Sequence, residues 1–311
     1  MNTILTLSSF IFPLITFPYV SRILLPEGTG RVSFATSVVS YFLMLSQLGI
    51  PTYGIRACAK VRDDRRKLSR VVHELMAINL VMSLLSYLAL GIFVFAIPRL
   101  RAQSSLIFII SLTILLNAVG MEWLYKALEQ YTYITIRSVI FKAIAVVAML
   151  LLIRQQSDYV VYGALTILAA SASNVCNFVH AHTYIDLFPE EKYNYRQHMK
   201  PILVFFAMSC ATVIYTNLDT VMLGLMKNNV DVGYYNAAVK IKGILVGIVT
   251  SLGTVMLPRL SYYVERGEME EFQRLTKKAM NFVILLATPM MIYFILFARE
   301  GIFFLSGSAY E

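Results

Sequence analysis

Apolar residues fill most of the chain in long stretches that polar residues interrupt only briefly. A helix that crosses a bilayer needs about 20 mostly apolar residues. The stretches that reach this length are residues 3–24, 32–50, 75–97, 106–128, 134–153, 159–185, 202–226, 233–257 and 279–297, and a tenth begins at Ile302. They are too long and too uniformly apolar for barrel strands. The pattern therefore predicts an all-α polytopic membrane protein with 9–10 transmembrane helices.

Composition supports lipid as the solvent of these helices. Of the 311 residues, 58% are hydrophobic and 14% are charged, whereas soluble domains carry about 25% charged residues. A net charge of +9 would suggest nucleic acid in a soluble protein. Here we expect no nucleic-acid partner, because basic residues set membrane topology. The three cysteines form no CxxC pair, so no disulfide, metal site or cofactor is expected.

The distribution of lysine and arginine predicts the orientation. The loops after the second, fourth, sixth and eighth stretches carry sixteen such residues and the other loops carry seven. Positive charge accumulates in cytoplasmic loops, so these loops and the N-terminus are predicted to be cytoplasmic. The two longest polar segments, 56–70 and 258–278, fall on that side. Each is predicted to form a short amphipathic helix at the membrane surface.

A weak internal repeat predicts two units. Residues 30–35 (GRVSFA) open the second stretch and residues 233–238 (GYYNAA) open the eighth, each followed by a cytoplasmic polar segment. Parallel repeats of this kind occur in transporters, although chance similarity between apolar helices is an alternative. We expect an N-terminal six-helix bundle over 1–185, a cytoplasmic linker over 186–200, and the start of a second bundle over 201–311.

Ionisable residues inside spans are costly and mark functional candidates. Asp219 and Lys240 both fall about 10 Å below the outer surface, so adjacent antiparallel helices could bring them together. Such a pair could fix helix packing, or it could open when substrate or a coupling ion competes for one partner. Lys242 lies about 200° around the helix from Lys240, and only one of the two lysines is expected to face a wet cavity.

The fifth stretch carries Arg137 and Lys142. Lys142 lies near the midplane with no acidic residue in its own stretch, which predicts a water-filled cavity or an anionic ligand. Pairing with a distant carboxylate or with carbonyl groups is the alternative. Arg22 and Arg31 flank the outer ends of the first two stretches, where they could meet a phosphate or anchor the interface. Asn177 could line a cavity or bind a neighbouring helix.

Motifs for soluble enzymes are absent from the sequence. It contains neither a Walker A motif nor a dinucleotide fingerprint, and the loops are too short for a catalytic domain. A membrane glycosyltransferase or polymerase is expected to show a long extracytoplasmic loop with clustered carboxylates, which the sequence lacks. We therefore expect a carrier rather than an enzyme.

Five motifs resemble, in order, those of polysaccharide-biosynthesis flippases, the O-antigen and capsule repeat-unit transporters of the Wzx/RfbX type. They are residues 18–30 (PYVSRILLPEGTG), 48–56 (LGIPTYGIR), 122–129 (EWLYKALE), 217–224 (NLDTVMLG) and 232–240 (VGYYNAAVK). The resemblance implies two six-helix bundles around a central cavity, as in the multidrug and polysaccharide exporter superfamily, working by alternating access. It also implies Arg22, Arg31, Lys142, Asp219 and Lys240 as cavity or gate residues.

The implied substrate is an undecaprenyl-pyrophosphate-linked oligosaccharide, moved across the bacterial inner membrane for O-antigen, capsule or exopolysaccharide synthesis. Polysaccharide polymerase machinery would be a partner. The family has twelve or more spans, so the second bundle is expected to be truncated. A cation-coupled multidrug exporter of the same fold is an alternative. It predicts a cavity richer in acids, whereas the ionisable residues within these spans are mainly basic.

Overall fold

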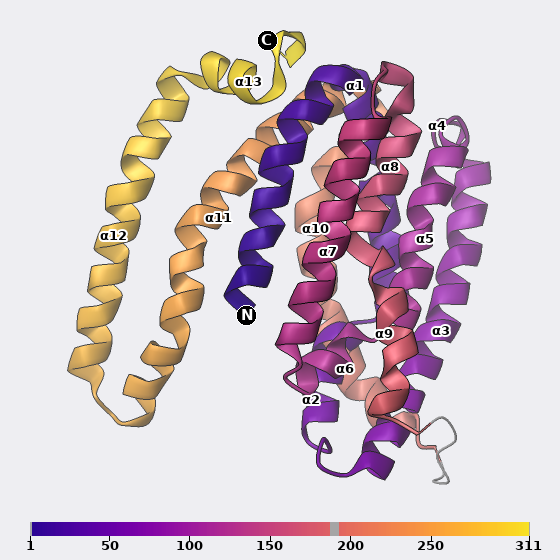
Figure 1. The fold of residues 1–311 in the computed structure, drawn as a ribbon, viewed down its shortest axis with the longest axis vertical. Helices are drawn as coiled ribbons and strands as arrows, with labels where there is room; N and C mark the ends of the chain where they lie inside the picture. Colours follow the sequence, from indigo (N-terminus) through magenta and orange to yellow (C-terminus); the bar gives the residue numbers. More distant parts are fainter. Residues whose placement is uncertain (1, 187–192, 311) are drawn as a thin grey trace.

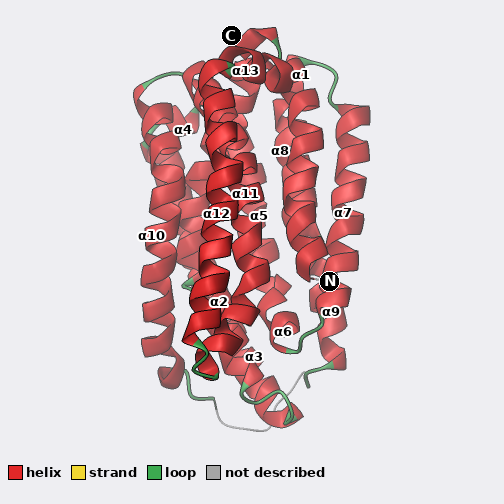
Figure 2. Ribbon diagram, turned by 90° about the vertical axis from the view of Figure 1, so that its left-hand side faces the viewer, coloured by secondary structure: helices red, strands yellow, loops and turns green. Residues whose placement is uncertain are grey.

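The computed structural model describes residues 2–186 and 193–310, which are helical and contain no strand. The long helices run side by side along the long axis of the molecule (Figures 1 and 2). Within the described residues, six helical stretches are long and apolar enough to cross a membrane. The prediction of an all-α polytopic membrane protein is confirmed. Below, the upper and lower ends of the molecule are those of Figure 1.

The chain forms thirteen α-helices over the described residues. They are α1 (Asn2–Gln47), α2 (Ile50–Ala59), α3 (Arg65–Ala96), α4 (Pro98–Arg101), α5 (Ser104–Gly120), α6 (Glu122–Ala127), α7 (Tyr131–Leu152), α8 (Tyr159–Ile167), α9 (Asn174–His180), α10 (Arg196–Met226), α11 (Asn229–Glu265), α12 (Met269–Leu296) and α13 (Ala298–Ser306). A π-helical turn, η2 (Leu168–Ala172), joins α8 to α9. Helix α12 contacts α11 and α13 and stands apart from the other long helices (Figure 1).

The first two predicted spans are the two arms of α1. Leu25 has φ 58° and ψ 176°, a conformation that costs a non-glycine residue about 1–3 kcal/mol. At this residue the first arm ends at the upper end of the molecule, and the second arm returns to α2 at the lower end (Figure 1). Pro26 then starts the second arm, where its fixed φ suits a first helical turn. The turn between the two arms is therefore a single strained residue.

Three other predicted spans differ from the observed helices. The fourth is divided at Met121, whose left-handed backbone (φ 40°, ψ 35°) separates α5 from α6. The sixth is divided into α8, η2 and α9. The tenth begins at Ala298 as α13, which ends after nine residues. A helix of that length rises about 14 Å, which is too short to cross a bilayer.

The two glycines of the internal repeat pack against each other's helices at the upper end. A Cβ on Gly30 would lie 1.8 Å from the carbonyl oxygen of Asn229, and a Cβ on Gly233 would lie 2.0 Å from that of Pro26. The backbones of α1 and α11 therefore touch at a point where neither glycine has a side chain. The lack of a side chain at both glycines permits this close approach.

Gly233→Ala is expected to destabilise the protein by about 1–3 kcal/mol, because the added methyl group forces two backbones apart. Gly243→Ala in the same helix is the matched control, since a Cβ there meets nothing within 4 Å and alanine is the better helix former. Thermal unfolding of the purified protein measures the difference. Equal melting temperatures for the two variants would show that the helices do not need this contact.

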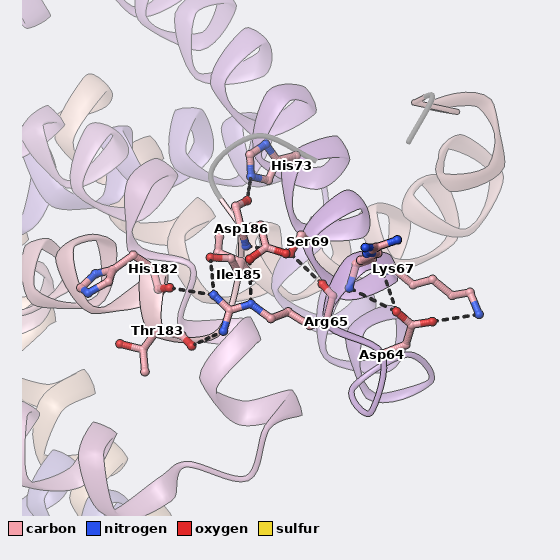
Figure 3. Close-up of polar contacts among 10 residues, drawn as sticks. Asp64, Arg65, Lys67, Ser69, His73, His182, Thr183, Ile185 and Asp186 are labelled. Atoms are coloured by element: carbon pink, nitrogen blue, oxygen red, sulfur yellow. Dashed lines mark hydrogen bonds and ion pairs between the residues drawn. The ribbon is translucent and has the colours of Figure 1, made fainter. Parts of the chain in front are cut away.

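Helix α3 begins at the lower end of the molecule, where Asp64 and Arg65 each make several polar contacts. Asp64 accepts hydrogen bonds from the backbone of Lys67 and from its side chain, and these donors hold the pKa of this carboxyl below its usual range. Arg65 binds Asp186 Oδ1 through Nε at 2.8 Å and donates to the carbonyl oxygens of Thr183 and His182 (Figure 3). The end of the first predicted bundle is therefore tied to the first turn of α3.

The predicted cytoplasmic linker, 186–200, lies partly outside the described residues, at 187–192. Its two described ends both bind the first three turns of α3. The backbone N–H of Asp186 donates to Ser69 Oγ at 2.8 Å, and the described residues beyond the gap bind Glu74. The predicted surface helix within 258–278 is not separate, because α11 continues to Glu265 and turns at Gly267 into α12.

Candidate functional site

A cavity of about 710 Å³ lies among the first arm of α1, α6, α7, α8, η2 and α11. Three of its lining residues are lysines, so we call it the lysine cavity. Much of the remaining lining is apolar and includes phenylalanines of α1 and alanines of α7 and η2. The polar side chains that line it are Thr16, Glu122, Lys126, Ser138, Lys142, Tyr162, Thr166 and Lys240.

Two of the lysines lie against the first arm of α1. Lys142, midway along α7, places Nζ 5.8 Å from the ring centre of Phe12, and Lys240 of α11 places Nζ 4.6 Å from that of Phe17. Aromatic faces attract cations at such distances. Lys142 is one of the residues that line the lysine cavity. That this lysine binds an anion stays a prediction.

The third lysine belongs to an ion pair that the sequence reasoning missed. Lys126 Nζ lies 2.8 Å from Glu122 Oε1, one turn apart on α6. The left-handed Met121 makes Glu122 the first residue of α6, and this break turns the pair toward the lysine cavity. Sequence analysis used these residues only as part of a motif. A glutamate four residues before a lysine at the end of an apolar stretch was the available signal.

Asp219 and Lys240 do not form the predicted pair. Asp219 is exposed and accepts a 2.6 Å hydrogen bond from the hydroxyl of Tyr235. Tyr235 and Lys240 lie about 140° apart around α11, so the residue that faces Asp219 on α10 is Tyr235. The sequence carries no information on rotation about the helix axis, and this rotation places Tyr235 against Asp219. Lys240 is among the residues that line the lysine cavity, whereas Lys242 is exposed and is not among them.

Arg137 and Asn177 lie outside the lining of the lysine cavity. Arg137 is buried and donates to the carbonyl oxygen of Ser173, where the π-helical turn meets α9. Asn177 is fully buried and donates to the carbonyl oxygen of Gly120 at 2.6 Å. Asn177 thus binds a carbonyl group beside the break at Met121, and Arg137 adds a second donor to the Ser173 oxygen, which also accepts from the backbone N–H of Cys176. Their contacts fix the two interrupted spans.

Arg22 and Arg31 lie at the upper end, also outside the lining of the lysine cavity. Arg22 donates to the carbonyl oxygen of Phe304 in α13 at 2.8 Å. Arg31 binds Glu27 at 2.7 Å and the hydroxyl of Tyr159 at 3.2 Å. Both guanidinium groups therefore join segments of the protein at this end. A contact with a phosphate stays a prediction for each.

Two further cavities adjoin the second arm of α1. One, of about 450 Å³, lies among this arm, α2 and α10. A smaller one, of about 140 Å³, contains Asn79, Asn117 and Asn174 in its lining, together with Glu122 and Lys126. We call the smaller one the asparagine cavity. Glu122 and Lys126 thus form a wall shared by the lysine cavity and the asparagine cavity.

The sequence of this chain matches a known protein family. The profile of a family described as "Polysaccharide biosynthesis protein" matches residues 1–264. A protein of Escherichia coli (strain K12) named "Putative O-antigen transporter" is 22% identical over 257 residues, which cover 82% of this chain and 62% of that protein. A Shigella dysenteriae protein of the same name is 26% identical over 266 residues, covering 82% of this chain and 64% of that protein.

The chain therefore spans less than two thirds of the length of these two relatives. No solved structure matches it.

Proposed function

The chain belongs to the polysaccharide biosynthesis protein family, and from this premise we propose that it is a flippase for lipid-linked sugar repeat units. The substrate is an oligosaccharide carried on undecaprenyl pyrophosphate, moved from the inner to the outer leaflet of the bacterial cytoplasmic membrane. The observation that carries the proposal is the lysine cavity, which holds three basic side chains between predicted membrane spans.

The chemistry of the cavity suits a pyrophosphate head group. Lys126, Lys142 and Lys240 lie on three different helices around it. Charge attraction is stronger in surroundings of low dielectric constant than in water. A volume of about 710 Å³ falls within the usual range for small-molecule sites. The pyrophosphate and first sugars would occupy the cavity while the polyprenyl tail stays in the bilayer.

Alternating access needs a wall that can bend. The first arm of α1 forms one wall and contains Pro13 and Pro18, each of which removes a helix hydrogen bond and favours a kink. We propose that this arm moves when the cavity changes sides. The lower end, which contains the basic segments, faces the cytoplasm in this scheme, and the N-terminus is cytoplasmic. Polysaccharide polymerase machinery would consume the product at the outer leaflet.

A complementation experiment tests the proposal. The gene encoding this chain is expressed in a bacterium that lacks its own flippase, and surface polysaccharide is measured. We expect restoration by the wild type and none by a variant with Lys142→Ala and Lys240→Ala together. The purified protein is also incubated with nucleotide-linked and lipid-linked sugar donors. Sugar transfer by the protein itself would contradict a carrier and favour a membrane glycosyltransferase.

A further inference from the structure

We propose that Glu122 is an internal counter-anion of the lysine cavity, which the incoming phosphate groups displace. The inference rests on the proposed function and adds a step to it. In the empty carrier the Glu122 carboxylate neutralises part of the lysine charge. When the substrate arrives, its pyrophosphate takes over the lysines and Glu122 turns toward the asparagine cavity.

Glu122 lies in the lining of the lysine cavity together with all three lysines. Its Oε1 lies 2.8 Å from Lys126 Nζ, and both side chains are a little over one third exposed. Among the described residues that line the lysine cavity, Glu122 supplies the negative charge.

Electrostatics require such a group when no substrate is present. Three lysines and one glutamate line the cavity, so its formal charge is 3 − 1 = +2. Without Glu122 the lining would hold three ammonium groups and no carboxylate, and like charges around one cavity repel one another. With pyrophosphate bound, the same carboxylate becomes a like charge beside the ligand, and the repulsion drives it away.

The local backbone allows this movement. Glu122 is the first residue of α6 and follows the left-handed Met121, so its side chain lies at the edge of a helix rather than within one. Rotation about its side-chain bonds breaks the ion pair with Lys126 and leaves the backbone of α6 unchanged. The asparagine cavity lies on the other side of the same wall, and amide N–H groups of asparagine can donate to a carboxylate.

Displacement of Glu122 by the ligand predicts a change in ligand affinity opposite to that of a purely structural residue. A residue that only maintains the fold weakens ligand binding when it is replaced. A competing anion instead strengthens binding when its charge is removed, because the ligand no longer has to displace it. Glu122→Gln keeps the size of the side chain and removes the charge, so it separates these two roles. Tighter binding would also slow release of the ligand, so transport should fall.

Titration calorimetry with inorganic pyrophosphate as the probe tests the inference on the purified chain. We expect Glu122→Gln to bind pyrophosphate about 5–10-fold more tightly than the wild type, the usual scale of coupling between two sites. Glu122→Asp, which keeps the charge but cannot reach Lys126 as well, should show a smaller gain. Glu129→Gln is the control, because Glu129 is exposed and pairs with Arg62 outside the cavity.

The variants also distinguish this inference from the proposed function. If the wild type binds pyrophosphate and Lys142→Ala abolishes binding, but Glu122→Gln and Glu122→Asp bind no more tightly than the wild type, the counter-anion role is wrong and the flippase proposal survives. If the wild type does not bind pyrophosphate, both are wrong. In the Glu122→Gln, Lys126→Gln double variant, the gain from Glu122→Gln should shrink, because the pair acts as a unit.

Discussion

Lys142→Ala is expected to lower transport of the lipid-linked sugar by about ten- to a hundredfold. The lysine borders the cavity midway along α7, and a contact between a charged donor and an anion contributes about 1.5–3 kcal/mol, with each 1.4 kcal/mol corresponding to about a tenfold change. The measurement is surface polysaccharide in the complemented strain, together with the lipid-linked repeat unit that accumulates in the inner leaflet.

Two variants control for loss of positive charge and for misfolding. Lys242→Ala removes a lysine that is exposed on the same helix as Lys240 and lies outside the lining of the cavity, so transport should stay near the wild-type level. Lys142→Arg keeps the charge and should retain most transport. Normal surface polysaccharide with Lys142→Ala, at equal protein abundance, would exclude Lys142 from the transport site.

Glu74→Ala is expected to destabilise the protein by about 3–5 kcal/mol, the cost of breaking a buried ion pair. Glu74 is fully buried in α3. Its carboxylate accepts hydrogen bonds from the backbone N–H of Asn194, from Gln197 Nε2 at 2.9 Å and from Arg70 Nε at 3.1 Å. His198 Nε2 lies 2.6 Å from Oε2. Replacement by alanine removes this shared acceptor from a buried site.

Thermal unfolding of the purified protein measures this effect. Glu74→Gln should lie between the wild type and alanine, because the amide keeps an acceptor oxygen but loses the charge. Glu268→Ala is the control, since Glu268 is exposed at the turn before α12 and should leave the melting temperature unchanged. A melting temperature of Glu74→Ala equal to that of the wild type would show that the contacts of Glu74 do not hold α3 to α10.

The sequence revealed those features that break a strong local pattern. Lys142 is conspicuous because a cation in an apolar stretch is costly, and Gly30 and Gly233 because a small residue recurs at the same place in each unit. The prediction that Asp219 and Lys240 form a pair was wrong for a physical reason. Asp219 meets Tyr235, which lies on another face of α11 than Lys240, and periodicity carries no information on how a helix is rotated against its neighbours.

Two other features depend on contacts that a sequence does not display. Glu74 and His198 are 124 residues apart, and each lies just outside a predicted span, where polar residues are unremarkable. The break at Met121 has no proline to signal it. It depends on a neighbouring helix, because Asn177 of α9 supplies the donor for the carbonyl group of Gly120.

The crossing of α1 and α11 at Gly30 and Gly233 limits how the molecule can move. Two backbones in direct contact cannot approach further, and separating them would lose the packing at this crossing. We therefore expect the crossing to act as a pivot, about which the two helices can tilt. A tilt of about 10° there displaces the far end of a helix that is about 30 Å long by roughly 5 Å, so the largest excursions fall at the opposite end of the molecule.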